Sequence, residues 1–280
     1  MSRAPRPQAA SVKPATGFGP ARTKGLTYER GNRVLCTTED VRSSEMIEAG
    51  ADAVSTDSSV TEVCYDAARG VSYPRPRLRG VLHQVSFAVS LVAGALLVTA
   101  AHGTAAKIAA GIYAASVTGL FAASALYHRI PWQAAARRRM QRLDHAMIFM
   151  LIAGTYTPVL LLRMPEPYDV VGLCAVWGLA LTGLVVHMCW LDAPERLIGG
   201  IYLGLGWLAV PALPLLLHRI APAGLALIVA GGALYTLGAL GYHRRWPNPA
   251  PAVFGFHEVF HTFVCAAVAC HYVAIAIFVL

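Results

Sequence analysis

Charged side chains are nearly absent from most of this sequence after residue 80. Seven long apolar segments contain no Lys, Arg or Asp, and Glu258 is the one acid within them. Charged residues make up only 14% of the chain, whereas hydrophobic residues make up 56%. This composition is too apolar for a soluble domain with an ordinary charged surface. We therefore predict a multi-pass integral membrane protein.

Cysteine is also scarce, with six residues in 280. Their spacing fits neither a zinc ribbon nor a disulfide framework, so we interpret them as free and mostly buried thiols. No N-terminal signal peptide is visible, because the first apolar run begins only near Val81. Nucleic acid is not an expected partner despite the net charge of +8, because most of the basic surplus lies in short loops between apolar segments.

The N-terminal region differs sharply from the rest of the chain. Residues 1–78 carry eleven Lys or Arg and nine Asp or Glu, and no convincing apolar period appears. We predict a disordered cytoplasmic tail over 1–78 and a membrane domain over 79–280. A further hypothesis is that Met46 is the true start and that residues 1–45 are not native. An intact mass of endogenous protein that includes residue 2 would exclude it.

Each of the seven apolar segments approaches the roughly 20 residues that a membrane-spanning helix needs. They cover about 81–101, 108–127, 145–162, 170–190, 197–217, 220–242 and 254–280. The predicted fold is an all-α membrane protein, a bundle of seven transmembrane helices. Prolines at 158, 211 and 214 are expected to kink their helices. Close helix–helix contacts are expected at Gly199, Gly200, Gly204, Gly206, Gly231 and Gly232.

The loops between the segments predict the orientation. Eleven Arg lie directly before segment one, at positions 75, 77 and 79, or in the loops after segments two, four and six, against three Lys or Arg in the opposite loops. The positive-inside rule then places the N-terminus in the cytoplasm and the C-terminus outside. We expect an integral, multi-pass protein of a bacterial inner (plasma) membrane, whose partners are membrane lipids; the sequence indicates no protein partner.

Polar side chains gather at one predicted depth of this bundle. His257 and His261 open the last segment four residues apart, so they lie on one face of a helix. His128 ends segment two and Asp144 begins segment three. Odd-numbered helices start at the cytoplasmic side and even-numbered ones end there, so all four are expected in the cytoplasmic leaflet. Polar groups at membrane depth are costly and usually functional.

Three histidines and a water form a common catalytic zinc set. We predict that His128, His257 and His261 bind Zn²⁺ directly. Asp144 would hold the fourth ligand, a water, or orient a ligand, and would accept a proton. Ser124 lies one turn from His128 on the same face and would donate a hydrogen bond to an oxyanion. Each histidine alone is more often a packing residue, and it is their convergence that favours the metal.

The sequence does not decide the roles of the other polar residues near this depth. His83 either joins the site or only hydrogen-bonds near the interface. Glu258 is either a base or a residue that faces cytoplasmic water. His145 points about 100° away from Asp144 around the helix and is left out of the site. We place the remaining apolar-segment and loop histidines toward the outer side: His102, His187, His218 and His271.

These motifs together resemble the progestin and adipoQ receptor superfamily, and most of all its bacterial haemolysin III branch. The resemblance covers about residues 74–280 and is carried by five phrases. They are Arg79-Gly80-x-x-His83, Ser124-Ala125-Leu126-Tyr127-His128, Asp144, Ala153-Gly154-Thr155-Tyr156-Thr157-Pro158 and Phe256-His257-Glu258-Val259-Phe260-His261. The resemblance implies seven transmembrane helices with a cytoplasmic N-terminus. It also implies a zinc site on the three histidines, with Asp144 and Ser124 beside it.

The resemblance implies a lipid-related function without fixing the reaction. Eukaryotic relatives include adiponectin receptors with ceramide-hydrolysing activity, and the bacterial branch is linked to haemolysis and membrane lipid homeostasis. The favoured prediction is a zinc-dependent hydrolase of lipid amide or ester bonds. One alternative is a zinc metalloprotease, because His257-Glu258-x-x-His261 matches H-E-x-x-H. The other is a haemolytic, pore-forming or receptor-like protein with a structural zinc site.

Overall fold

A computed structural model of the chain describes residues 34–38, 62–66, 71–190 and 194–280. Within these residues, seven helical segments are long and apolar enough to cross a membrane. The prediction of a seven-helix membrane protein is confirmed. The helices are α1 (Val81–Ala100), α2 (Thr104–Arg129), α3 (Ala134–Arg163), α4 (Tyr168–Cys189), α5 (Glu195–Trp207), α6 (Leu213–Leu216), α7 (Pro222–Arg244) and α8 (Phe256–Ala274).

Helix lengths follow the thickness of the bilayer. α1 has 20 residues, which at about 1.5 Å per residue span the roughly 30 Å of hydrocarbon. α3 is longer, with 30 residues, and begins eleven residues before the predicted start at 145. The prediction followed apolar residues only, whereas the first turns of α3 are rich in Ala, Arg, Met and Gln. These are strong helix formers that extend the helix beyond the apolar segment.

The fifth span is broken, as its prolines predict. α5 ends at Trp207 and is followed by a short 3₁₀ helix, η2 (Val210–Ala212), and by α6. Pro211 and Pro214 lie in these two short elements, where a missing N–H cannot continue a regular helix. α8 ends in a short π-helix, η3 (Ile275–Val279).

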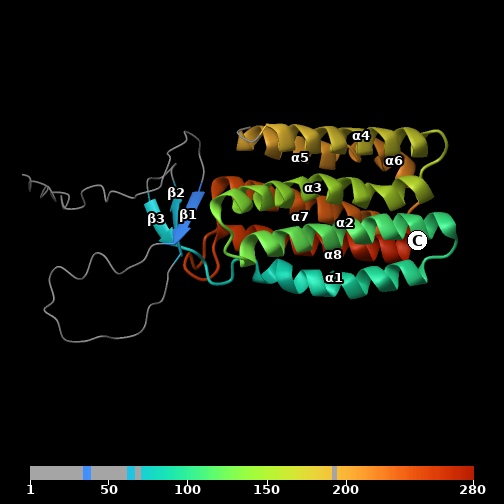
Figure 1. Cartoon of the computed structure of the whole chain (residues 1–280). Coiled ribbons are helices and arrows are strands. Elements are labelled where there is room, and N and C mark those ends of the chain that lie inside the picture. The colour runs from blue at the N-terminus through green and yellow to red at the C-terminus, as the bar shows by residue number, and fades with distance from the viewer. Residues whose placement is uncertain (1–33, 39–61, 67–70, 191–193) are drawn as a thin grey trace, which may run out of the picture.

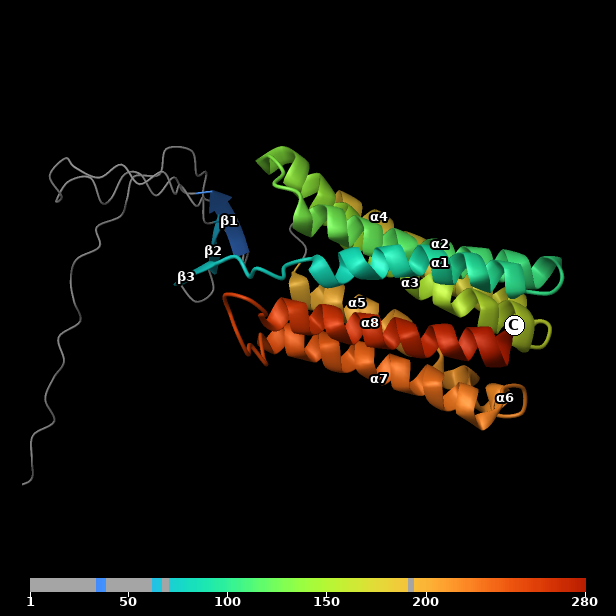
Figure 2. The same cartoon turned by 90° about the horizontal axis from the view of Figure 1, so that it is seen from below.

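Sequential packing arranges the helices around the bundle (Figure 1). α1 packs on α2, α2 on α3, α3 on α4 and α7 on α8, and α1 also contacts α8. α1 therefore lies beside both α2 and α8. Seen from below, α7 and α8 lie side by side (Figure 2). The starts of α1, α3 and α8 and the end of α2 share one end of the bundle, whereas the C-terminus lies at the other end.

Most of the glycines expected at close contacts are not at them. A Cβ at Gly199, Gly200, Gly204, Gly206 or Gly232 would meet nothing within 4 Å, and only Gly231 of the predicted set lies against a neighbour, His271. Glycine spacing alone does not show which face of a helix meets a partner, so this expectation was wrong for α5.

A small sheet was not predicted. Strands β1 (Val34–Thr38), β2 (Glu62–Asp66) and β3 (Val71–Pro74) form an antiparallel sheet in the order β1-β2-β3. The expectation of disorder over 1–78 is therefore corrected for these strands. They are only four or five residues long and rich in Val, Thr and Tyr, which favour strands without giving a long apolar period. Residues 75–78 are also described, and the backbone N–H groups of Arg77 and Leu78 donate to Ala252 and Val253 in the loop before α8. The remaining residues of the predicted tail, with Met46, lie outside the described residues.

Candidate metal centre

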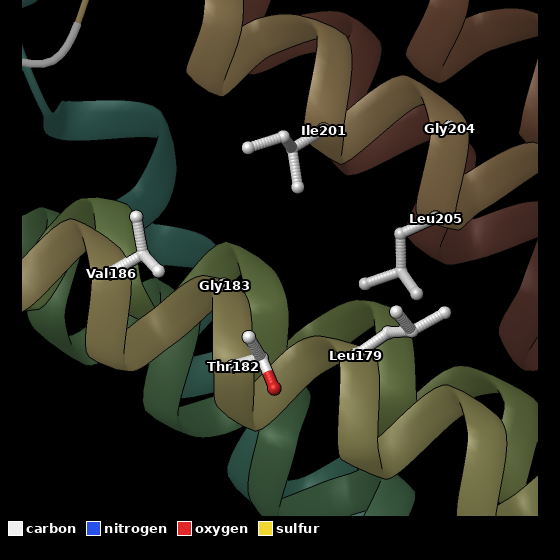
Figure 3. Close-up of a pocket in the computed structure, with 7 residues that line it drawn as sticks. All are labelled: Leu179, Thr182, Gly183, Val186, Ile201, Gly204 and Leu205. Carbon is white, nitrogen blue, oxygen red and sulfur yellow. The ribbon is translucent and has the colours of Figure 1, made fainter.

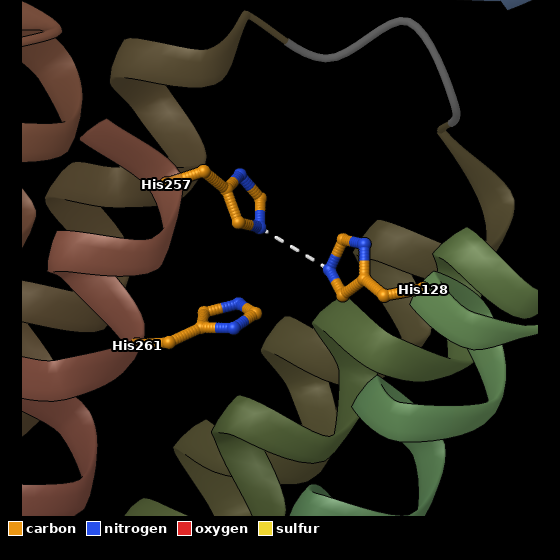
Figure 4. Close-up of side chains that lie close together, drawn as sticks. All are labelled: His128, His257 and His261. Atoms are coloured by element: carbon orange, nitrogen blue, oxygen red, sulfur yellow. Dashed lines mark hydrogen bonds between the residues drawn. The ribbon is translucent and has the colours of Figure 1, made fainter. Parts of the chain in front are cut away.

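Three histidines from two helices converge at the end of the bundle where α1 begins. His128 comes from the last turn of α2, and His257 and His261 come from the first turns of α8 (Figure 4). One ring nitrogen of each lies within 4.8 Å of the others, and His257 Nε2 is 3.2 Å from His128 Nε2. His128 and His261 are buried and His257 is half-buried. The three residues predicted to be ligands are thus brought together.

The donor set fits a metal ion. Two nitrogens bound to one zinc at about 2.0–2.1 Å in tetrahedral geometry lie about 3.3 Å apart, close to the 3.2 Å between His257 Nε2 and His128 Nε2. His261 Nδ1 is buried without a hydrogen-bond partner, as expected of a polar atom whose partner is an ion or a water. Imidazole suits zinc and several other divalent metals. The cluster can therefore hold a metal ion.

Ser124 and Asp144 lie near each other at the end of the bundle that carries the histidines. Ser124 is buried one turn before His128, and its Oγ is 2.8 Å from His83 Nδ1. The Asp144 carboxylate lies near the Ser124 side chain. Asp144 also lies 3.8 Å from His145 Nδ1, although that nitrogen is 2.7 Å from the carbonyl oxygen of Gln141. Asp144 is thus a neighbour of Ser124 at the edge of the centre.

The structure shows the contacts of Glu258, whose role the sequence left open. Its Oε1 accepts a hydrogen bond and forms an ion pair with Arg79 Nε. Its Oε2 accepts a hydrogen bond of 2.8 Å from the backbone N–H of Gly255, the N-cap of α8. Glu258 is only 2% exposed. Both carboxylate oxygens are therefore used to fix the start of α8 rather than to face water.

Gly80 explains why the chain before α1 approaches the centre so closely. It caps α1 with a φ of 78°, a left-handed conformation that favours glycine. A Cβ at this position would lie 2.5 Å from the Cβ of His128. The segment that carries Arg79 and His83 can therefore pass directly over the last turn of α2.

One predicted placement was wrong. His187 was expected at the outer side, but it lies two residues before the end of α4, and even-numbered spans end where the three-histidine centre lies. Its ring centroid is 5.6 Å from that of His145, which lies about three turns into α3. The rule that even-numbered spans end at the cytoplasmic side, which located His128, would also have placed His187 at that side.

An apolar pocket lies elsewhere, between α4 and α5 (Figure 3). It has a volume of about 320 Å³. Thr182 is the one polar side chain among the residues that line it, and its hydroxyl donates to the Gly178 carbonyl at 2.7 Å. The side chains that line the pocket include no His, Cys, Asp or Glu that could bind a metal. Among the described residues, the candidate metal ligands are the three histidines.

The fold and the site define a class: an integral membrane bundle of seven helices with three histidines clustered near one end. Comparison with known proteins gives the family. A family model described as "Haemolysin-III related" matches residues 71–272, and the chain belongs to this family. This confirms the resemblance to the haemolysin III branch of the progestin and adipoQ receptor superfamily.

Individual relatives agree with this assignment. The chain is 30% identical over 203 residues to Hemolysin-3 of Bacillus cereus, a match that covers 71% of this chain and 90% of that protein. It is 33% identical over 153 residues to a Hemolysin-3 homolog of Bacillus subtilis (strain 168), covering 55% and 68%. The human Monocyte to macrophage differentiation factor is 27% identical over 197 residues, covering 69% and 79%. The bacterial relatives fit the predicted location in a bacterial plasma membrane.

Proposed function

We propose that the chain is a zinc-dependent membrane hydrolase that cleaves an amide or ester bond of a lipid. The observation that carries this proposal is the approach of three imidazoles from α2 and α8, with a hydroxyl and a carboxylate beside them. Three protein ligands leave one position of a tetrahedral ion open for chemistry, whereas structural sites are usually closed by four. The amide or ester bond of a lipid lies near the membrane surface, so it can reach this end of the bundle while the acyl chains stay in the bilayer.

The residues have separable roles in this reaction. His128, His257 and His261 would hold the ion, which when bound supplies Lewis acidity and activates water near neutral pH. Asp144 would accept the proton of the attacking water. Ser124, whose hydroxyl lies near Asp144, would donate a hydrogen bond to the developing oxyanion.

The proposed orientation places this centre at the cytoplasmic side. The helix ends around the histidines are rich in Arg: Arg129 ends α2, Arg244 and Arg245 lie at the end of α7, and the first turns of α3 carry Arg137, Arg138, Arg139 and Arg142. Short loops rich in Lys and Arg favour the cytoplasm. Tagging the two chain ends and testing protease access in intact cells would check it, with an accessible N-terminus at the outer surface as the contrary result.

Proteolysis is the less favoured reaction. An H-E-x-x-H protease uses the glutamate between its histidines as a base. Glu258 is buried and bonded through both oxygens to Arg79 and to the N-cap of α8. A base needs a free oxygen directed at the water, so Glu258 is unsuited to this role.

Lipid turnover by purified protein tests the hydrolase proposal. The substrates are ceramide-type amides and phospholipid or acylglycerol esters in mixed micelles, with released fatty acid as the readout. We expect turnover in the wild type, loss of at least about 100-fold in Asp144→Asn and in His261→Ala, and retention of much activity in Glu258→Gln. Hydrolysis that persists unchanged in His261→Ala would refute the proposal.

Membrane lysis is the second candidate function, because two bacterial relatives carry the name hemolysin. Under this proposal the histidines would hold a structural ion. Release of dye from liposomes by the purified protein, without release of fatty acid, would favour it over the hydrolase.

A further inference from the structure

We propose that His83 is a positioning residue of the metal centre, through which α1 orients two groups that α2 and α8 supply. This inference rests on the proposed metal site. The observation behind it is that one buried ring contacts a candidate ligand on one face and hydrogen-bonds Ser124 at its edge.

The first contact is with a candidate ligand. The His83 and His261 rings are stacked, with centroids 3.7 Å apart and planes 10° from parallel. His83 also meets Phe121 of α2 edge-on, with centroids 5.1 Å apart. The His83 ring is therefore packed from two directions and can limit rotation of the His261 side chain. A ring that stacks over His261 does not point a nitrogen at the same ion, and His83 is outside the group of converging ligand atoms.

The second contact is with Ser124 of α2. The Ser124 Oγ lies 2.8 Å from His83 Nδ1, and both side chains are buried. His83 Nε2 is buried without a hydrogen-bond partner among the described residues. His83 thus links α1 to the hydroxyl of Ser124, one turn before the candidate ligand His128.

The chain before His83 is fixed to the start of α8 and to the loop before it. The N–H groups of Arg77 and Leu78 donate to the carbonyl oxygens of Ala252 and Val253, in the loop before α8, at 3.0 Å each. Arg79 is paired with Glu258 in the first turn of α8. The start of α1 is therefore attached to α8 independently of any metal, as an orienting element requires. Groups that orient metal ligands typically change metal affinity by about 10-fold to 100-fold when removed.

The test separates the two contacts by substitution. His83→Phe keeps a flat ring over His261 but removes the hydrogen bond to Ser124. His83→Asn keeps a donor near the position of Nδ1 but removes the ring. His271→Asn is the matched control, because His271 is also buried on α8 but contacts the Ile228 carbonyl, far along the helix from the centre.

The probe is Co²⁺ alone, titrated into metal-free protein in detergent, with its visible absorption reporting ligand geometry. We expect His83→Asn to weaken Co²⁺ binding by about 10-fold or more and to change the spectrum. His83→Phe should stay within about 3-fold of the wild type, because the stack is kept, and His271→Asn should not differ from it. Monodispersity on gel filtration confirms that each variant is folded.

The outcomes are distinguishable. Wild-type Co²⁺ affinity and spectrum in His83→Asn would overturn the positioning role and leave the metal centre intact. Equal weakening in His271→Asn and His83→Asn would also overturn it, because the effect would then be general to the bundle. Failure of the wild type to bind Co²⁺ or Zn²⁺ would overturn the metal centre and this inference together.

Discussion

The ion pair between Arg79 and Glu258 gives a quantitative prediction for stability. The side chains are 12% and 2% exposed, so water cannot solvate either charge if the other is removed. Removing one partner of a buried pair costs about 3–5 kcal/mol. Glu258→Gln keeps one neutral acceptor oxygen, for either Arg79 or the Gly255 N–H, which recovers about 1 kcal/mol. We therefore expect a net loss of about 2–4 kcal/mol.

The assay is thermal unfolding in detergent, followed by the fraction of protein that stays monodisperse. For chains of about 150–250 residues, each kcal/mol shifts Tm by about 2–4 °C, so Glu258→Gln should lower Tm by about 4–16 °C. Glu166→Gln is the matched control, since it removes the same charge from an exposed position and should shift Tm by less than about 2 °C.

The double variant distinguishes a charge effect from a loss of shape. Arg79→Gln combined with Glu258→Gln leaves no unpaired charge, so it should be more stable than the sum of the two single losses predicts. A Tm for Glu258→Gln within about 2 °C of the wild type, or strictly additive losses in the double variant, would refute this reasoning.

Two further predictions use glycines with matched controls. Gly80→Ala should lower Tm and metal content together, because its Cβ would collide with His128. Gly103 has a φ of 84° and a ψ of 162°, a conformation that also favours glycine, but a Cβ there would meet nothing within 4 Å. Gly103→Ala should therefore show a backbone cost of about 1–3 kcal/mol without metal loss. Equal metal content in the two variants would contradict this. Gly183→Ala should destabilise the protein by about 1–3 kcal/mol, because its Cβ would overlap the Phe149 ring of α3. A Cβ at Gly178 on the same helix would meet nothing within 4 Å, so Gly178→Ala should be neutral or stabilising in the same Tm assay. Equal losses of stability in the two variants would be the contrary result.

The sequence was sufficient for the spans and for the convergence of the ligands. Bilayer thickness fixes helix length, and strict alternation of direction puts the end of one span beside the start of the next. His128, Asp144 and the pair His257 and His261 could therefore be assigned to one end before any packing was known. The i, i+4 spacing placed the last two on one helix face.

The contacts around these ligands could not be predicted in the same way. The stack of His83 on His261 depends on how α1 is rotated against α2 and α8, which hydropathy does not encode. The pairing of Arg79 with Glu258 joins residues 179 positions apart, so no local pattern shows it. The three-stranded sheet depends on pairing between strands of four or five residues, too short for periodicity to reveal.

The central claim is that helices α2 and α8 hold one metal ion between them. Zinc content by inductively coupled plasma mass spectrometry, on protein purified in detergent without chelators, tests it most directly. We predict about one zinc per chain in the wild type and a clear reduction in both His128→Ala and His257→Ala. Absence of zinc from the wild type, or full zinc content in either variant, would contradict the account.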